Sequence, residues 1–232
     1  VEAAMNNSNI KAIVLRVDSP GGDALASDLI AEVLRKGKGK KPIIVSQGYV
    51  AASGGYWLSM FADTIVAAPN TITGSVGVIG SFMFNKTLKQ DLGLSVDHVQ
   101  KGKFADLGFG ATLPLIGISL PDRDFTDEEL KMAETGIKTL YKGFVEKVAL
   151  GRKKSFDDIE KIAQGRVWSG SDGLKNGLVD VLGGLDAAIK IALQKANLTN
   201  SEYEIIEMPE PEWFDLNSFL PSFLRIEQKI VE

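Results

Sequence analysis

Residues 12–48, AIVLRVDSPGGDALASDLIAEVLRKGKGKKPIIVSQG, decide the fold class. Two apolar, β-branched runs within them, residues 12–18 and 42–48, have the composition of strands that are buried on both faces of a parallel sheet. The segment between the runs spaces its apolar residues as an amphipathic helix does. These apolar residues are Leu25, Leu29, Ile30, Val33 and Leu34. A strand, a helix and a second strand in this order predict a βαβ unit with parallel strands.

Further along the chain the same alternation continues. DTIVAAP, residues 63–69, predicts a third buried strand, and a short buried helix is expected to begin near Ser53. TITGSVGVIG, residues 71–80, is β-branched and interrupted by glycines, which indicates an irregular strand that lines a site. The chain is therefore expected to form a layered α/β fold built from parallel βαβ units.

Three later helices are predicted from their end signals. Thr126 and Glu129 have the spacing of a capping box at the start of a long amphipathic helix. Ser155 is the expected N-cap of a second helix, and a third helix is expected to end near Asn197.

The domain division follows from a change in composition. Residues 1–197 are expected to form one domain, which begins without its opening strands. Residues 198–232 form a tail rich in proline, acidic and aromatic residues, and we expect it to pack on a neighbouring surface. The aromatic residues of the tail include Trp213, Phe214, Phe219 and Phe223.

Composition excludes several classes of function. The 232 residues are 44% hydrophobic, carry a net charge of −4 and contain no cysteine. The chain can bury a full core, but it has no disulfide, thiolate nucleophile or zinc knuckle. The one dense basic run, residues 35–41, is interpreted as a solvated helix end, so no nucleic-acid partner is expected. No cofactor or metal site is predicted, and no segment here has the length of a membrane span or the pattern of an export signal.

Ser53 stands among small residues in YVAASGGYW and is either part of a close-packed turn or a nucleophile. A serine hydroxyl needs a base to become nucleophilic. His98, the only histidine, has no serine near it in the sequence, so a serine, histidine, aspartate triad is disfavoured. Ala51 replaces the first glycine of the G-x-S-x-G motif. A lysine with a lowered pKa is the remaining base.

Gly21 and Gly22 follow the first strand and precede a helix. This position suits backbone donors for an oxyanion, although a Pro-Gly-Gly sequence also forms ordinary tight turns.

Four ordered motifs together resemble the signal peptide peptidase A family, also called protease IV. They are LRVDSPGGDALAS (15–27), AASGGYW (51–57), TITGSVGV (71–78) and IAQGRVWSGSDGLKNGLVDVLGGLDAAI (162–189). The resemblance implies a crotonase-like fold shared with the caseinolytic protease family. It also implies a membrane-bound serine endopeptidase that uses a serine/lysine dyad.

By position, the resemblance implies that Ser53 is the nucleophile and that Ser75 hydrogen-bonds the catalytic lysine. It implies that Gly21, Gly22 and the amide of Gly54 surround the oxyanion.

The apolar, glycine-spaced segment after Ser75 is expected to bind an extended substrate as an added β-strand, through Val76, Gly77 and Val78.

One position departs from the family. Short members carry the lysine in a segment like G-K-Y-K-D, and KGKFADLG here has Ala105 in its place. This chain could be the carboxyl-terminal half of a long tandem form whose other half supplies the lysine. Ala105 could instead be an engineered replacement of the lysine. The chain could also be a non-catalytic homologue, or one that uses Lys101 or Lys103.

Two other classes of function compete with a peptidase. An acyl-CoA enzyme of the crotonase fold would share the glycine turn but would not need Ser53. A non-catalytic scaffold within an oligomeric chamber would explain Ala105. As a peptidase, the protein is expected to cleave signal peptides or other extended peptides as a ring-shaped homo-oligomer. It is expected at the bacterial inner membrane, attached through a segment outside this chain and facing the periplasm.

Overall fold

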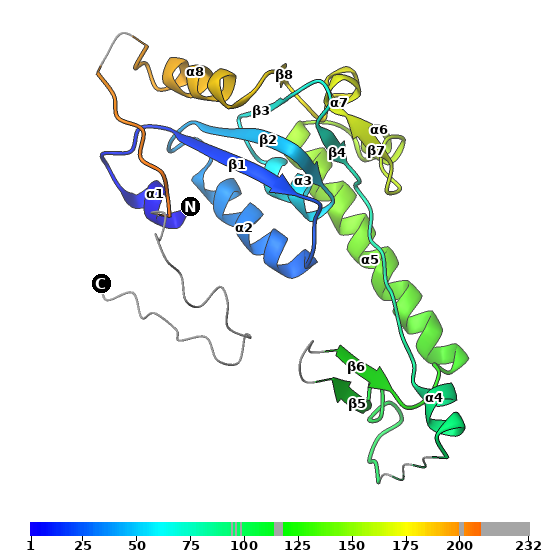
Figure 1. The fold of residues 1–232 in the computed structure, drawn as a ribbon. Coiled ribbons are helices and arrows are strands. Elements are labelled where there is room, and N and C mark those ends of the chain that lie inside the picture. Colours follow the sequence, from blue (N-terminus) through cyan, green and yellow to red (C-terminus); the bar gives the residue numbers. More distant parts are fainter. Residues whose placement is uncertain (94, 96, 98, 114–117, 200–201, 210–232) are drawn as a thin grey trace. The chain divides into compact units, whose positions relative to one another are not determined.

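The computed structural model describes residues 1–93, 95, 97, 99–113, 118–199 and 202–209 (Figure 1). The chain divides into two compact units. The first comprises Val1–Ile79 and Thr135–Glu204, and the second comprises Gly80–Glu134 and Ile205–Glu232. The expected division at residue 197 stays a prediction, as does the docking of the tail, whose Trp213, Phe214, Phe219 and Phe223 lie outside the described residues.

Helices and strands alternate along the first half of the chain, as expected. The helices are α1 (Glu2–Asn6), α2 (Ala24–Gly37), α3 (Gly54–Ser59), α4 (Lys86–Asp91), α5 (Asp127–Arg152), α6 (Phe156–Glu160), α7 (Gly170–Asn176) and α8 (Leu185–Lys195). The strands are β1 (Ile13–Ser19), β2 (Ile43–Ala52), β3 (Thr64–Ala67), β4 (Ile72–Gly74), β5 (Gly110–Leu113), β6 (Ile118–Pro121), β7 (Val167–Ser169) and β8 (Val181–Leu182).

The first unit is built on a six-stranded sheet with β2 at its centre. Strand order is β7-β4-β2-β3-β8, and β1 pairs with β2. β2 runs parallel to β1, to β3 and, near its carboxyl end, to β4. The pairs β3–β8 and β4–β7 are parallel and antiparallel, respectively. The predicted α/β fold with parallel βαβ units is therefore confirmed.

Helices cover both faces of this sheet (Figure 1). On one face, buried residues of α2, α3 and α5 join the strands in the main core, which includes Leu34, Ile43, Tyr56, Met60, Phe144 and Val148. On the other face, Ile44 and Val66 pack against Ala188 and Ala192 of α8. Since neighbouring residues of β2 face opposite cores, the continuous apolar run at 43–45 is what a doubly covered parallel strand requires.

An irregularity in β2 lies just upstream of the Ser53 motif. Val17 pairs with Gln47, but Ser19 pairs with Ala51, so β2 contains extra residues between the two pairs. Asp18 fills this bulge, and its Oδ1 accepts a hydrogen bond from the Val50 amide at 3.0 Å. The bulge therefore shifts the pairing of β2 with β1 before the chain reaches Ser53.

The predicted helix ends are also observed. The Thr126 amide donates to Glu129 Oε2 at 2.8 Å, and the Glu129 amide donates to Thr126 Oγ1 at 3.3 Å, which is a reciprocal capping box. Ser155 caps α6 through the Asp158 amide. Asn197 takes a left-handed φ of 58° just beyond α8.

The second unit contains α4 and the antiparallel hairpin of β5 and β6, in which Gly110 pairs with Pro121 and Leu113 with Ile118. Phe125 packs edge-on against Phe82 and Phe84, with ring centroids 4.8 and 5.2 Å apart. Among the helices described, none is both long enough and apolar enough to span a bilayer.

Candidate active site

Ser53 alone connects β2 to α3, in a strained turn. Its φ of 51° and ψ of −118° lie in a region that residues with a side chain rarely occupy. The Ser53 amide donates to the Gly74 carbonyl at 2.9 Å, and the Trp57 amide donates to the Ser53 carbonyl at 2.9 Å. Such a strand-to-helix turn is how α/β-hydrolases present a nucleophilic serine. It forms here although Ala51 replaces the first glycine of their motif.

Ser75 occupies the matching position on the neighbouring strand. Ala52 of β2 is in register with Gly74 of β4, so Ser53 and Ser75 are the next residues of two paired parallel strands. Ser75 also has a left-handed backbone, with φ 49°. Neighbouring strands are about 4.8 Å apart. Both serines are half-buried, and neither hydroxyl has a hydrogen-bond partner within the described residues.

Gly21 is packed so closely that it could not carry a side chain. A Cβ on Gly21 would lie 2.8 Å from Ser53 Cβ and 2.9 Å from the Gly54 nitrogen. A Cβ on Gly55 would lie 2.3 Å from the Ser19 carbonyl oxygen. The glycines of both segments therefore allow the loop after β1 to contact the Ser53 turn directly.

Two amides beside Ser53 are suited to bind an oxyanion. The amides of Gly22 and Gly54 have no acceptor among the described residues, and a Cβ placed on Gly54 would lie 3.2 Å from the Gly22 nitrogen. A Cβ on Gly22 would meet nothing within 4 Å, so this residue faces open space. The Gly21 amide instead donates to Ser19 Oγ at 3.2 Å. Gly21 thus provides close packing, while Gly22 and Gly54 offer the donors.

Side chains distant in sequence anchor α3 behind the turn. Tyr56 is fully buried and donates from its hydroxyl to the Leu178 carbonyl at 3.0 Å. Trp57 stacks on Phe144 with centroids 4.1 Å apart and donates from Nε1 to Asp28 Oδ1 at 3.0 Å. These supports are not predictable from the sequence, because nothing local to the serine motif indicates its partners.

The segment expected to bind substrate begins in the core. Val76 is completely buried among core residues, so its side chain is not available to a ligand. Its carbonyl accepts from the Gly165 amide at 3.0 Å. Gly77 and Val78 are half-buried, and Ile79 is 94% exposed. Substrate binding by Val76, Gly77 and Val78 as an added β-strand stays a prediction.

Ala105, at the position where the family resemblance leads us to expect the lysine, lies in the second unit, whereas Ser53 lies in the first. Ala105 is exposed within a turn, and its amide donates to the Gly102 carbonyl at 3.5 Å. Lys103 forms an ion pair with Glu128, and its Nζ lies 5.3 Å from the centroid of the Phe104 ring. No lysine amine is hydrogen-bonded to Ser53 within the described residues. His98 lies outside them.

An ionic cluster holds the turn that contains Ala105. Arg123 binds Asp106 through Nε and Nη2 at 2.6 and 2.8 Å, and binds Glu129 through both Nη atoms at 2.7 Å. The hydrogen bonds from Arg123, and then that from the Thr126 amide, lower the pKa of Glu129 to about 2. The residue next to Ala105 is thereby fixed to the start of α5.

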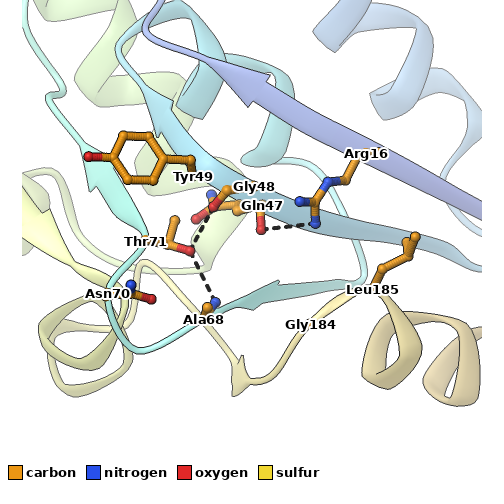
Figure 2. A pocket seen from close by; sticks show the side chains of 9 residues that line it. All are labelled: Arg16, Gln47, Gly48, Tyr49, Ala68, Asn70, Thr71, Gly184 and Leu185. Carbon is orange, nitrogen blue, oxygen red and sulfur yellow. Dashed lines mark hydrogen bonds between the residues drawn. The ribbon is translucent and has the colours of Figure 1, made fainter.

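A pocket of about 390 Å³ lies beside the β2 bulge (Figure 2). Its lining residues are Arg16, Gln47, Gly48, Tyr49, Ala68, Asn70, Thr71, Gly184 and Leu185, which include neither serine of the site. Thr71 is 1% exposed, donates from Oγ1 to the Gly48 carbonyl at 2.8 Å and accepts from the Ala68 amide at 3.1 Å. Thr71 therefore holds the bulge that Asp18 also fills.

In the described part of the chain, no three or more His, Cys, Asp or Glu residues are grouped so that they could hold a metal ion.

Comparison with known proteins identifies relatives of this chain. It is 38% identical to Serine protease SPPA, chloroplastic, of Arabidopsis thaliana over 91% of the chain, and 40% identical to Protease 4 of Salmonella typhi over 85%. It is 32% identical over 83% to the Putative signal peptide peptidase SppA of Enterococcus faecium. The chain spans 30%, 30% and 53% of these proteins, respectively. A similar solved structure is that of a ClpP1 mutant from Listeria monocytogenes, at TM-score 0.49 and 15% identity over 77% of each chain.

The family assignment rests on a match that includes three of the four motifs in full. The sequence profile of Peptidase family S49 matches residues 35–199, which contain AASGGYW, TITGSVGV and the segment 162–189. Since this match covers more than half of the chain, the chain belongs to peptidase family S49, the family of the signal peptide peptidase A serine peptidases.

Proposed function

We propose that this chain is the serine-bearing part of an endopeptidase in which Ser53 is the nucleophile. The observation that carries the proposal is the strained strand-to-helix turn at Ser53, with Ser75 at the next position of the paired strand. A strain of this kind persists where the surrounding structure requires it, and such positions are concentrated at active sites.

Each side chain and backbone amide of the site has a defined part in the proposed reaction. Ser53 Oγ attacks the carbonyl carbon of the peptide and loses its proton to a neutral lysine amine, which Ser75 orients. The amides of Gly22 and Gly54 stabilise the negative oxygen of the tetrahedral intermediate. The protonated amine then gives its proton to the leaving nitrogen, and water hydrolyses the acyl-serine ester by the same route.

We assign the lysine to another half of the protein or to another subunit. Ala105 supports this assignment, because it has no amine at the position where the family resemblance leads us to expect one. The lengths of the relatives also support it, since the chain spans only 30% of Serine protease SPPA and of Protease 4. In this proposal the chain is the carboxyl-terminal half of a tandem form and works within a ring-shaped homo-oligomer.

The name of the Enterococcus faecium relative supports signal peptides as substrates. The proposal extends this substrate class to other extended hydrophobic peptides. The proposal includes attachment to the bacterial inner membrane through a segment outside these residues, with the peptidase on the periplasmic side. A non-catalytic scaffold, or a form inactivated by an engineered lysine-to-alanine change at position 105, is the second candidate, and Ala105 is the observation that favours it.

A fluorophosphonate probe of serine hydrolases tests the assignment. We expect the full-length assembly to be labelled, Ser53→Ala to abolish the labelling, and Ser8→Ala, at an exposed serine, to leave it unchanged. We expect the isolated 232-residue chain to remain unlabelled. Labelling that appears in the isolated chain after Ala105→Lys would favour the inactivated form, and labelling that survives Ser53→Ala would exclude Ser53 as nucleophile.

A further inference from the structure

The backbone of Ser75 is held by a turn from a distant part of the sequence. The Ser75 amide donates to the Arg166 carbonyl at 2.8 Å, and the Gly165 amide donates to the Val76 carbonyl at 3.0 Å. These two bonds extend the β4–β7 ladder, whose last register pair is Gly74 with Val167. The left-handed backbone at Ser75 is therefore held by hydrogen bonds between residues 75–76 and the turn at 164–166.

This turn lies so close to the backbone that follows Ser75 that residue 77 could not carry a side chain. A Cβ on Gly77 would lie 2.7 Å from Gly165 Cα. Gln164 and Gly165 both have left-handed backbones, with φ 58° and 75°. A displacement of the turn would thus be transmitted directly to the backbone on both sides of Ser75.

Tyr141 of α5 fixes the turn from outside. Its hydroxyl accepts a hydrogen bond from the Gln164 amide at 3.2 Å and donates to Glu160 Oε2 at 2.5 Å. Glu160 Oε1 also accepts from Gln164 Nε2 at 3.3 Å. Burial, followed by the hydrogen bond to Glu160, raises the pKa of Tyr141 to about 12, so the hydroxyl keeps its proton throughout the neutral range.

We propose that Tyr141 is a positioning residue for the reaction, which acts by holding the Gln164–Gly165 turn against Ser75 and thereby aiming the Ser75 hydroxyl at the catalytic base. This inference rests on the proposed function, because it requires that Ser75 orients that base. Among the described residues, the Tyr141 hydroxyl is hydrogen-bonded to Glu160 and Gln164 and to neither serine. In this inference its effect on the reaction passes through Ser75.

A double-mutant cycle in the full-length protein separates this role from a merely structural one. We expect Tyr141→Phe, which removes only the hydroxyl, to lower kcat for a hydrophobic peptide about tenfold, with KM changed less than about twofold. The matched control is Tyr203→Phe, at a tyrosine that is 51% exposed, and it should leave both constants unchanged. In a Ser75→Ala background, Tyr141→Phe should lower kcat by less than about twofold further.

Equal losses from Tyr141→Phe in the parent protein and in the Ser75→Ala background would overturn the inference, because they would show that Tyr141 acts independently of Ser75. An unchanged kcat in Tyr141→Phe, or in Ser75→Ala, would overturn it too. Failure of the proposed function gives a different result, namely normal turnover by Ser53→Ala. Thermal unfolding of each variant, recorded alongside, identifies any loss of kcat that arises from unfolding at the assay temperature.

Discussion

Ser53 and Ser75 leave two paired parallel strands at the same register, and both do so with a left-handed backbone, φ 51° and 49°. The hydrogen bond from the Ser53 amide to the Gly74 carbonyl links the two strands at the point where they end. Since each conformation is unfavourable for a residue with a side chain, the pair stores strain at one end of the sheet.

Ser53→Gly should raise stability while it abolishes cleavage. Glycine adopts a positive φ without steric conflict, so the substitution relieves strain of about 1 kcal/mol or more. For a chain of this size, that corresponds to a rise in Tm of about 2–4 °C. Differential scanning calorimetry and peptide cleavage measure the two effects. Ser53→Ala is the control, because alanine keeps the strain. A glycine variant no more stable than the alanine variant would contradict strain at this position.

Gly21→Ala should reduce both stability and activity. The added Cβ would lie 2.8 Å from Ser53 Cβ, at a φ of 114° that alanine avoids. We expect a loss of about 1–3 kcal/mol in the free energy of unfolding, measured with urea, and a loss of serine labelling. Gly136→Ala is the control, since Gly136 lies within α5 with nothing near its Cβ position. Alanine there should be neutral or stabilising by about 0.5–1 kcal/mol. Equal effects from the two substitutions would refute the packing argument.

Thr71→Val should loosen the β2 bulge. The variant leaves the Gly48 carbonyl and the Ala68 amide without their hydroxyl partner in a buried site, which costs about 1–3 kcal/mol. Urea unfolding measures this loss, and kcat reports whether the bulge sets the position of Ser53. Thr71→Ser keeps the hydroxyl, so it should retain most of the stability. If valine were tolerated as well as serine, the hydrogen bonds of Thr71 would not hold the bulge.

Acid should weaken the second unit through Glu129. Its pKa is lowered to about 2 in the folded chain, against an ordinary value of 4.5, so the unfolded chain binds more protons between these values. Stability from this group is complete above about pH 4.5 and is lost as the pH falls towards 2. Hydrogen exchange at the start of α5, followed from about pH 5 to about pH 2.5, measures the loss. Glu129→Gln should flatten this pH dependence, and an unaltered profile would argue against the Arg123 cluster as its cause.

Local signals predicted much of the first unit. The apolar runs at 12–18, 42–48 and 63–69 are the strands β1, β2 and β3, because buried parallel strands have a composition that needs no knowledge of their partners. The capping box at Thr126 and Glu129, in the second unit, was also predictable from the sequence, since both of its halves lie within four residues.

What could not be predicted depends on contacts across long stretches of sequence. The antiparallel pairing of β4 with β7 joins residues almost a hundred positions apart, and no local signal in the sequence indicates it. The support of Trp57 by Asp28 and Phe144 has the same origin. Of the two glycines expected near an oxyanion, sequence alone did not distinguish Gly21, whose amide is already bonded, from Gly22, whose amide is free of acceptors among the described residues.

Ser53, Ser75, Gly22 and Gly54 all lie within one unit, and this grouping has a consequence for the proposed enzyme before it assembles. In the proposed arrangement the nucleophile is already in its reactive geometry, and only the proton acceptor comes from elsewhere. The chain then behaves as a zymogen that matures without proteolysis. It is latent as long as it is unassembled, and assembly itself is the activating event.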